Sequence, residues 1–117
     1  MKFYNISNHP SDGWGAEQLE AACAYGDVED VAFPRVGFGD DVAGMADAIA
    51  ERVEEGSACM VQGEMRLTHA LANRLKAKGC IVLAAFSERE SVEQAMPDGS
   101  VRKASVFRFK GFEEYVD

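Results

Sequence analysis

Hydrophobic and polar positions along the chain alternate between short apolar runs and longer stretches with helical spacing. The runs are short enough for strands, rich in β-favouring residues and bounded by turn formers. They are residues 2–7, 28–33, 58–61 and 80–86. The run at 58–61 is uninterrupted, as in a central parallel strand that is covered on both faces.

Three stretches between these runs predict helices. The first is expected to be capped by Ser11 or Asp12 and to run to about Tyr25, before Gly26. The second begins after Asp40 and Asp41 and is ended by Gly56, and the third is ended by Gly79. Their apolar positions recur three or four residues apart, at Leu19, Ala22 and Cys23, at Val42, Met45, Ala46, Ile49 and Val53, and at Leu67, Leu71 and Leu75.

This alternation predicts an α/β fold, a Rossmann-like three-layer sandwich with helices on both faces of a parallel sheet. The simplest strand order is 2-1-3-4. Residues 93–96 and 101–109 flank Pro97-Asp98-Gly99-Ser100, which predicts a C-terminal β-hairpin on the edge of strand four. We expect a single domain over residues 1–117, with an α/β core at 1–90 and a hairpin extension at 91–117.

Charge and composition limit the classes of partner that this protein could bind. The formal net charge of −8 opposes non-specific DNA binding but leaves room for a small anionic ligand in a local pocket. No apolar stretch is long enough to cross a membrane, and the N-terminus lacks the pattern of a signal peptide. Cys23, Cys59 and Cys80 form no metal-binding or disulfide pattern and are expected to be buried thiols in the cytoplasm.

Topology selects the candidate site. In a doubly wound sheet the crevice lies outside the carboxyl ends of the strands where the winding reverses, here between strands one and three. Three loops reach that edge, and their residues are the candidates for ligand binding. They are Ser7, Asn8 and His9, then Gln62, Gly63 and Glu64, and one strand further out Ser87 and Arg89.

The turn after strand three has a specific chemistry. Gly63 would let the backbone approach a ligand closely, and the free amides at the start of the third helix would favour an anionic group. Arg66 in that first turn opposes the helix dipole unless an anion or the Glu64 carboxylate is near. The alternative is a simple tight turn with a solvated arginine.

The remaining candidates have two interpretations each. His9 and Glu64 are the candidates for acid and base catalysis, although a His9-Pro10 turn can also serve only to cap the backbone. Trp14 would stack on a base or cover the first helix. Ser87 and Arg89 would hold phosphate oxygens, or Arg89 would pair with a neighbouring glutamate.

Several familiar sites are absent from the sequence. There is no GxGxxG, GxxxxGK[ST] or GxSxG motif, which argues against NAD, ATP and serine-hydrolase functions. Glu64 and His69 do not share a helical face, and no other ligand spacing predicts a metal. We therefore expect no cofactor and no metal.

Four strings carry a resemblance: NHPSDGW (8–14), VQGEMRLTHAL (61–71), FSER (86–89) and FKGFEEY (109–115). They resemble small, largely uncharacterised CRISPR-associated proteins whose Rossmann-like fold is similar to the CARF ligand-sensing domains. Such domains are typically homodimers that bind cyclic oligoadenylates, and some cleave the ligand without metal. By position, the resemblance assigns ligand binding to Ser7, Asn8 and His9, and to Gln62, Gly63, Glu64 and Thr68.

The resemblance thus implies a nucleotide-sensing accessory protein in antiviral defence, with ring-nuclease activity as a further expectation. A second hypothesis is a non-enzymatic acidic module that dimerises or docks on a defence complex through the hairpin aromatics, Phe107, Phe109, Phe112 and Tyr115. A third is a small hydrolase that uses His9 and Glu64. The basic strip Arg102, Lys103, Arg108 and Lys110 is either an interface or a solvated strand edge.

Overall fold

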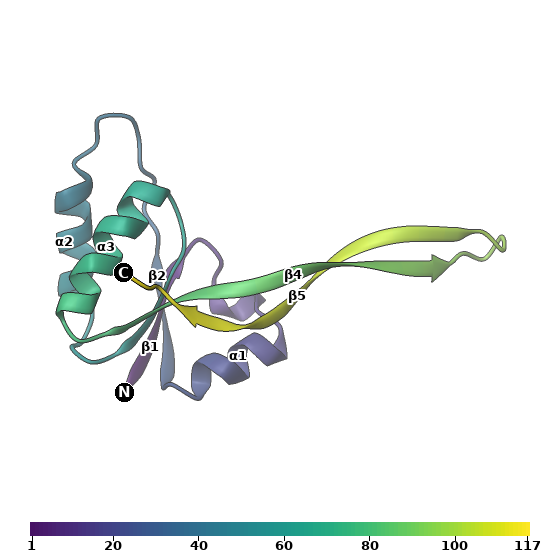
Figure 1. Cartoon of the computed structure of the whole chain (residues 1–117), viewed down its shortest axis with the longest axis horizontal. Coiled ribbons are helices and arrows are strands. Elements are labelled where there is room, and N and C mark those ends of the chain that lie inside the picture. The colour runs from purple at the N-terminus through teal and green to yellow at the C-terminus, as the bar shows by residue number, and fades with distance from the viewer.

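The computed structural model describes residues 1–117 as one mixed five-stranded sheet with three α-helices (Figure 1). The strands are β1 (Lys2–Ser7), β2 (Asp27–Ala32), β3 (Ala58–Val61), β4 (Ile81–Ala95) and β5 (Val101–Glu114). The helices are α1 (Ala16–Cys23), α2 (Val42–Glu51) and α3 (Met65–Ala77), and a short 3₁₀ turn, η1 (Ser11–Gly13), precedes α1.

The predicted strand order is confirmed. The sheet runs β2-β1-β3-β4-β5, with parallel pairing from β2 through β4 and an antiparallel β5 on the outer side of β4. β1 and β3 have the predicted bounds, because each is a buried run that ends at polar residues. The carboxyl ends of β1 and β3 therefore meet at one edge of the sheet, and β4 continues past that edge.

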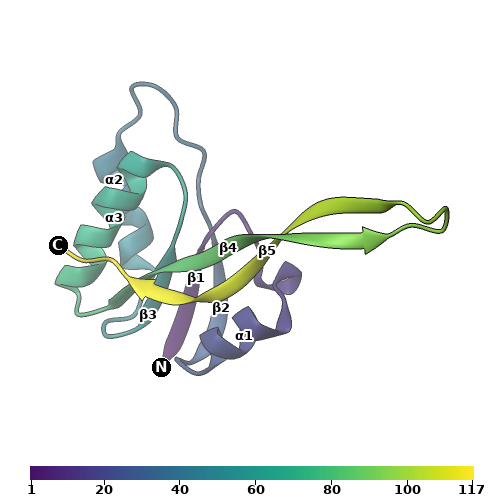
Figure 2. The ribbon, with the colours of Figure 1, turned by 45° about the vertical axis from the view of Figure 1, so that its right-hand side comes forward.

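The helices cover both faces of the sheet, as predicted. The larger core lies on the α2 and α3 face and includes Tyr4, Ile6 and Val61 of the sheet. The smaller core lies on the α1 face, where Phe3, Met60 and Leu83 are buried with Ala22 of α1. Figure 2 shows α2 and α3 side by side on one side of the sheet and α1 on the other. Successive side chains of each strand point to opposite faces of the sheet, as the pleat of a strand requires.

The helix termini differ from the prediction in three places. α1 starts at Ala16 after a Gly15 cap, because the backbone amide of Ser11 donates to Asp30 and residues 11–13 form the separate turn η1. Gly26 does not adopt a left-handed conformation. A Cβ there would collide with the carbonyl oxygen of Met1, so the glycine is needed for close approach. α2 ends at Glu51, and Gly56, with φ +74°, lies in the turn that follows.

The cysteines are all free thiols but are not all buried. Cys59 and Cys80 are buried in the larger core, and burial raises the pKa of the Cys59 thiol. Cys23 is exposed, so the prediction of three buried thiols was wrong at that position. It is the last residue of α1, and Ala22 is the only buried residue of that helix.

The main departure from the prediction is the length of β4. It continues from Ile81 to Ala95 instead of ending near Phe86, and it passes the expected junction at residues 90 and 91 without interruption. Together with β5 it forms a long hairpin that projects from the α/β layers (Figure 1). The Cα radius of gyration is 17.1 Å, whereas a compact chain of this length has about 13 Å.

A register shift between Phe86 and Ser87 marks where the hairpin leaves the sheet. We call residues 87–110 the arm and the rest of the chain the body. The aromatic residues divide between them: Phe112 packs in the smaller core, and the Tyr115 hydroxyl donates to the Val61 carbonyl over 2.6 Å. Phe107, in contrast, is 69% exposed. Only part of the predicted aromatic interface is therefore free to contact a partner.

Candidate functional site

The loops after β1 and β3 and the part of β4 where the arm begins surround one cavity, which we call the strand-end cavity. Its volume is about 730 Å³. His9 comes from the loop after β1, Gln62 from the end of β3, and Ser87 from β4 where the arm begins. The other lining residues are Gly13, Trp14, Gly15, Gln18, Met60, Ala85 and Phe107. None of them is Lys, Arg, Asp or Glu.

A buried polar network fixes the loop that carries His9. Asn5 is 1% exposed, and its amide nitrogen donates to the His9 carbonyl over 2.8 Å and to the Asp30 carboxylate over 2.9 Å. The Ser7 hydroxyl donates to the Asn5 side-chain oxygen and accepts from the His9 amide. The network holds the His9 backbone and leaves the imidazole exposed, so the ring does not cap the backbone.

Trp14 belongs to the same arrangement. Its indole nitrogen donates to the His9 carbonyl over 3.1 Å, and its ring centroid lies 6.2 Å from that of Phe3 in an edge-to-face contact. It also approaches Phe112, at 6.5 Å. Trp14 therefore covers the smaller core beside α1 and at the same time forms part of the cavity wall.

Gln62 extends the sheet beyond the end of β3. Its side-chain amide both donates to the Ala85 carbonyl and accepts from the Ala85 amide, each over 3.3 Å. It therefore takes the place of a further backbone pair between β3 and β4. This fixes Gln62 at the floor of the crevice, between the two faces of the sheet.

The start of α3 differs from the expectation of an open anion site. The Glu64 carboxylate accepts from the Leu67 amide over 2.9 Å and also pairs with Arg66 over 2.9 Å. The hydrogen bond from Leu67, and next the one from Arg66, lower the pKa of Glu64. The predicted partnership of Glu64 and Arg66 is thus present, and Glu64 occupies the position that a bound anion would take.

Gly63 has a packing role. A Cβ on Gly63 would lie 2.5 Å from three atoms of the Phe33 ring, and Phe33 is buried. The close approach for which this glycine is needed is therefore to Phe33 of the same chain. The backbone of the turn is pressed against the larger core instead of being left open above it.

The N-terminus of α1 is open, whereas the Glu64 side chain caps that of α3. No side chain caps α1, whose N-cap residue is Gly15. Gly15, Ala16, Glu17 and Gln18 line a second cavity, of about 540 Å³, together with Ser87, Phe107, Arg108 and Phe109. Gly15, Gln18, Ser87 and Phe107 line both cavities, so the hollow continues from the strand ends under the root of the arm.

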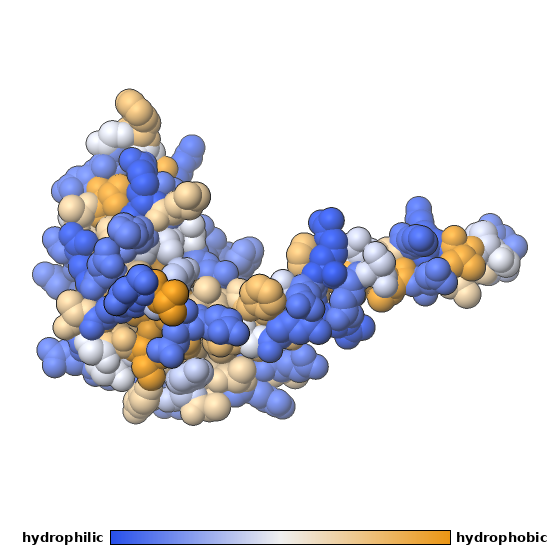
Figure 3. All heavy atoms as spheres, viewed as in Figure 1, coloured by the Kyte–Doolittle hydropathy of each residue, from blue (hydrophilic) through white to orange (hydrophobic).

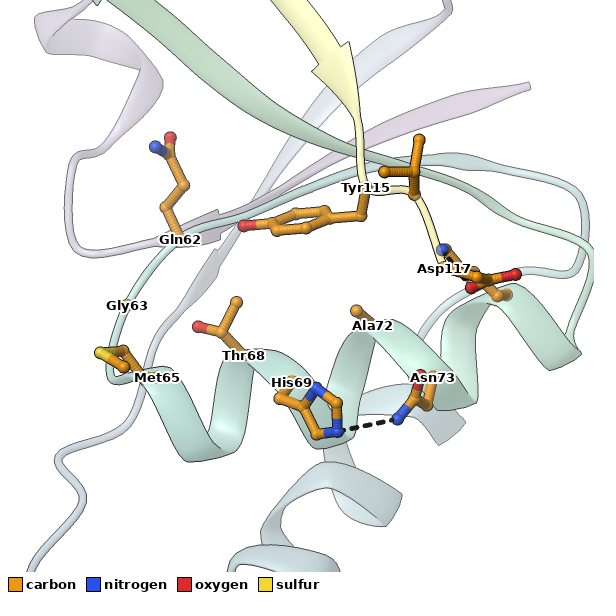
Figure 4. Close-up of a pocket in the computed structure, with 11 residues that line it drawn as sticks. Gln62, Gly63, Met65, Thr68, His69, Ala72, Asn73, Tyr115 and Asp117 are labelled. Carbon is orange, nitrogen blue, oxygen red and sulfur yellow. Dashed lines mark hydrogen bonds and ion pairs between the residues drawn. The ribbon is translucent and has the colours of Figure 1, made fainter.

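A third hollow, the α3 cavity, lies on the other face of the sheet between α3 and the C-terminal residues (Figure 4). Its volume is about 530 Å³, and Gln62, Gly63 and Thr68 line it with His69, Asn73 and Tyr115. The Thr68 hydroxyl oxygen is buried and has no hydrogen-bond partner. Lys76, also at this cavity, is paired with Asp117 over 2.8 Å.

The structure therefore divides the predicted residues. His9, Trp14, Gln62 and Ser87 share the strand-end cavity, whereas Gly63 and Thr68 line the α3 cavity. Ser7 is buried in the Asn5 network, and Asn8 and Glu64 line neither cavity. Arg89 lies on the arm with its guanidinium 5.4 Å from the centre of the Phe107 ring.

Sequence reasoning missed several residues of this site, and it assigned Phe107 only to a partner interface. Asn5 and Asp30 shape the His9 loop, and Gln18 and Met60 line the strand-end cavity. Asn5 had one detectable signal, a polar residue inside an apolar strand, since such a residue must find hydrogen bonds when buried. Nothing in the spacing marked the other three.

Two further findings concern the whole chain. No three His, Cys, Asp or Glu side chains come together in a way that would hold a metal ion. None of the helices has the length and apolar character needed to span a membrane.

Comparison with known proteins gives a family without an assigned activity. No curated protein and no solved structure matches the chain. A family model matches residues 1–113, and the chain therefore belongs to the uncharacterized protein MJ1673 family.

Proposed function

We propose that this protein is a cytoplasmic nucleotide sensor with a Rossmann-like, CARF-like fold, a CRISPR-associated accessory protein that binds cyclic oligoadenylate as a homodimer. The observation that carries the proposal is the convergence around one cavity of His9 and Gln62, from the ends of β1 and β3, and Ser87, from the part of β4 where the arm begins. The location agrees with the general position of ligands in open α/β sheets. The resemblance of the sequence strings supplies the class of ligand.

The strand-end cavity suits a base and its ribose. Its volume of about 730 Å³ lies within the usual range for small-molecule sites. Trp14 and Phe107 offer aromatic surfaces, and His9, Gln18 and Ser87 offer neutral hydrogen-bonding groups. Stacking and neutral hydrogen bonds are the interactions that recognise an unpaired nucleobase.

The adjoining cavity suits the phosphate. The uncapped first turn of α1 presents backbone amides and the positive end of the helix dipole. Ser87 lines the same cavity, as do Glu17 and Arg108, and Arg108 is paired with Glu90. This arrangement places base and phosphate positions next to each other around Ser87 and Phe107. We therefore propose a phosphate site at the N-terminus of α1, whereas the sequence had suggested one at the N-terminus of α3.

Ring-nuclease activity is the enzymatic form of the proposal. A ribose 2′-hydroxyl would attack the phosphorus of its own 3′-phosphate, form a 2′,3′-cyclic phosphate and expel the 5′-oxygen of the next nucleotide. The proton lost by the hydroxyl passes to that leaving oxygen, and the ring opens to a linear product without a metal. His9 is the titratable side chain at the strand-end cavity and is our candidate to move the proton. The hydrolase hypothesis has less support, because Glu64 is engaged in capping α3 and does not line the cavity with His9.

The test is to titrate the pure protein with cyclic tri-, tetra- and hexa-adenylate, with AMP as a linear comparison. At a ligand concentration a hundredfold above Kd, we expect a gain of about 2.7 kcal/mol and a rise in Tm of roughly 10 °C. Mass spectrometry of the same mixtures would detect linear products. Neither binding nor cleavage with any of the cyclic ligands would reject the proposal.

Matched variants locate the site. Phe107→Ala removes an aromatic wall and should raise Kd about tenfold, as expected for the loss of one stacking contact. Phe86→Ala is the control, since Phe86 is also an exposed phenylalanine near the arm but lines neither cavity. If cleavage is seen, His9→Ala should abolish it while His69→Ala, the other histidine, retains it. Equal effects within either pair would place the site elsewhere.

A further inference from the structure

The arm has one strand edge that nothing in the chain covers. β3 ends at Val61 and pairs with β4 only as far as Leu83, and Gln62 then occupies the backbone groups of Ala85. From Ser87 to Ala95 the side of β4 that faces away from β5 has no strand beside it. A free edge of this length is a template for pairing with another strand.

The arm also has little to stabilise it alone. A single two-stranded hairpin is marginally stable in water. Hydrophilic side chains dominate the visible face of the arm, with separate hydrophobic residues among them (Figure 3). Phe107 and Val101 are 69% and 63% exposed. The arm therefore has no hydrophobic core, although it extends well beyond the body.

We propose that a second copy of this chain covers the edge, through antiparallel pairing of the two β4 strands about a two-fold axis at Ser91. In this register Ser91 lies opposite Ser91 of the partner subunit. Arg89 then lies opposite Glu93 of the partner subunit, and by symmetry the pair occurs twice. The result is a continuous four-stranded sheet formed by two arms.

The charges select this register. Directly opposed residues of opposite charge stabilise a strand pair, and like charges destabilise it. A two-fold axis opposes one residue to its own copy, so the alternatives are axes at neighbouring residues. An axis at Glu90 would oppose Glu90 to its own copy, and an axis at Arg89 would oppose the two Arg89 side chains. An axis at Val92 would place Arg89 opposite Ala95 and lose both ion pairs. Among these registers, the Ser91-centred one alone forms both ion pairs without opposing like charges.

The side chains of Arg89 and Glu93 can both reach a partner subunit. Neither Arg89 nor Glu93 forms an ion pair within the chain, and both are exposed. Lys103 of β5 lies opposite Glu93 in the hairpin without forming an ion pair with it. Arg89 is held by its contact with the Phe107 ring. They are four residues apart on one strand, so both point to the same side of the arm, as a directly opposed pair requires.

The edge of β5 is a poorer partner for itself. Residues 101–110 contain Arg102, Lys103, Arg108 and Lys110 and no acidic residue. Pairing two β5 edges would bring these cations near their copies, and the glutamates of β4 compensate only Arg108 and Lys110. The arm is therefore self-complementary along β4 and protected by positive charge along β5.

The test is the oligomeric state of the ligand-free full-length protein, measured by sedimentation equilibrium up to about 1 mM, where a dimer with millimolar Kd would still be visible. We expect dimers for the wild type. Arg89→Glu should raise the dimer Kd about tenfold or more, because both ion pairs become repulsions. The double variant Arg89→Glu/Glu93→Arg restores both pairs with exchanged sign and should recover the wild-type Kd to within about threefold.

Arg102→Glu is the matched control. It makes the same change in net charge, on β5, and should leave the dimer Kd within about twofold. Circular dichroism checks that every variant keeps its fold. A monomeric wild type, an Arg89→Glu variant that dimerises normally, or a double variant that stays weakened would each overturn the proposal. The inference deepens the homodimer part of the proposed function. Because it is tested without nucleotide, its failure leaves the nucleotide proposal open.

Discussion

β4 passes through two environments within one continuous strand. In the body, Val82 and Leu83 are buried between neighbouring strands and under the helix layers. In the arm, the same strand pairs only with β5, and most of its side chains are exposed. Burial of apolar area therefore stabilises the first half, whereas cross-strand contacts hold the second.

Polar groups show the same contrast. In the body, Asn5 is buried and every side-chain hydrogen bond it makes fixes the β1 loop or Asp30. In the arm, Glu90 pairs with Arg108 and Lys110 in solvent. Removing a buried partner leaves unsatisfied groups, while a solvated ion pair is replaced by water at small cost. The position of a polar contact thus decides its energetic importance.

The largest expected effect is a difference in the free energy of unfolding between variants in the two halves of β4. Leu83→Ala opens a cavity in the smaller core, where Leu83 is 1% exposed, and should lower the free energy of unfolding by about 2–5 kcal/mol. Val92→Ala lies in the arm and should cost about 0.5 kcal/mol or less. Urea unfolding of both variants measures the difference. Similar losses would mean that the arm and the body share one packed core.

A smaller effect is expected from the buried network. Asn5→Ala should destabilise the protein by about 1–3 kcal/mol, because Ser7 and Asp30 each lose a hydrogen-bond partner. Release of the His9 carbonyl should also change the fluorescence of Trp14, which shares that acceptor. Asn73→Ala, which removes only an exposed contact with His69, is the control. An unchanged Trp14 signal would contradict the role given to Asn5.

The smallest effect concerns Glu90 and depends on pH. Hydrogen bonds from Lys110 and then Arg108 lower the pKa of Glu90 below its ordinary value of 4.5. Its stabilising contribution is therefore complete above that pH and is lost as pH falls through the lowered folded-state pKa. Hydrogen exchange of arm peptides should be faster in Glu90→Gln than in wild type at neutral pH, and the difference should vanish in acid. Faster exchange in body peptides would show that the arm is coupled to the body.

The regular parts of the fold were predictable because they follow local rules. Lys2–Ser7 and Ala58–Val61 are apolar runs bounded by polar residues, and the leucines of α3 repeat every four residues until Gly79, at φ +76°. The strand order followed from the alternation of strands and helices. The start of α1 was not predictable, because Asp30, far along the chain, holds Ser11 in a separate turn.

The candidate site was predictable in position and less so in composition. The strand-end rule located His9, Gln62 and Ser87 at one edge, since it depends only on topology. It could not separate them from Thr68, which lies across the sheet, or foresee that Phe107 of the arm would form a wall. Those assignments depend on how side chains from distant segments pack.

The sequence by itself determined the α/β pattern, the strand order, the hairpin turn and the edge of the sheet where the loops meet, because periodicity and turn chemistry are local. Tertiary structure decided that β4 continues past Phe86 to form the arm, that Glu64 caps α3 while α1 stays open, and that Gly63 packs on Phe33. These outcomes depend on contacts between residues far apart in the chain, which no local pattern records.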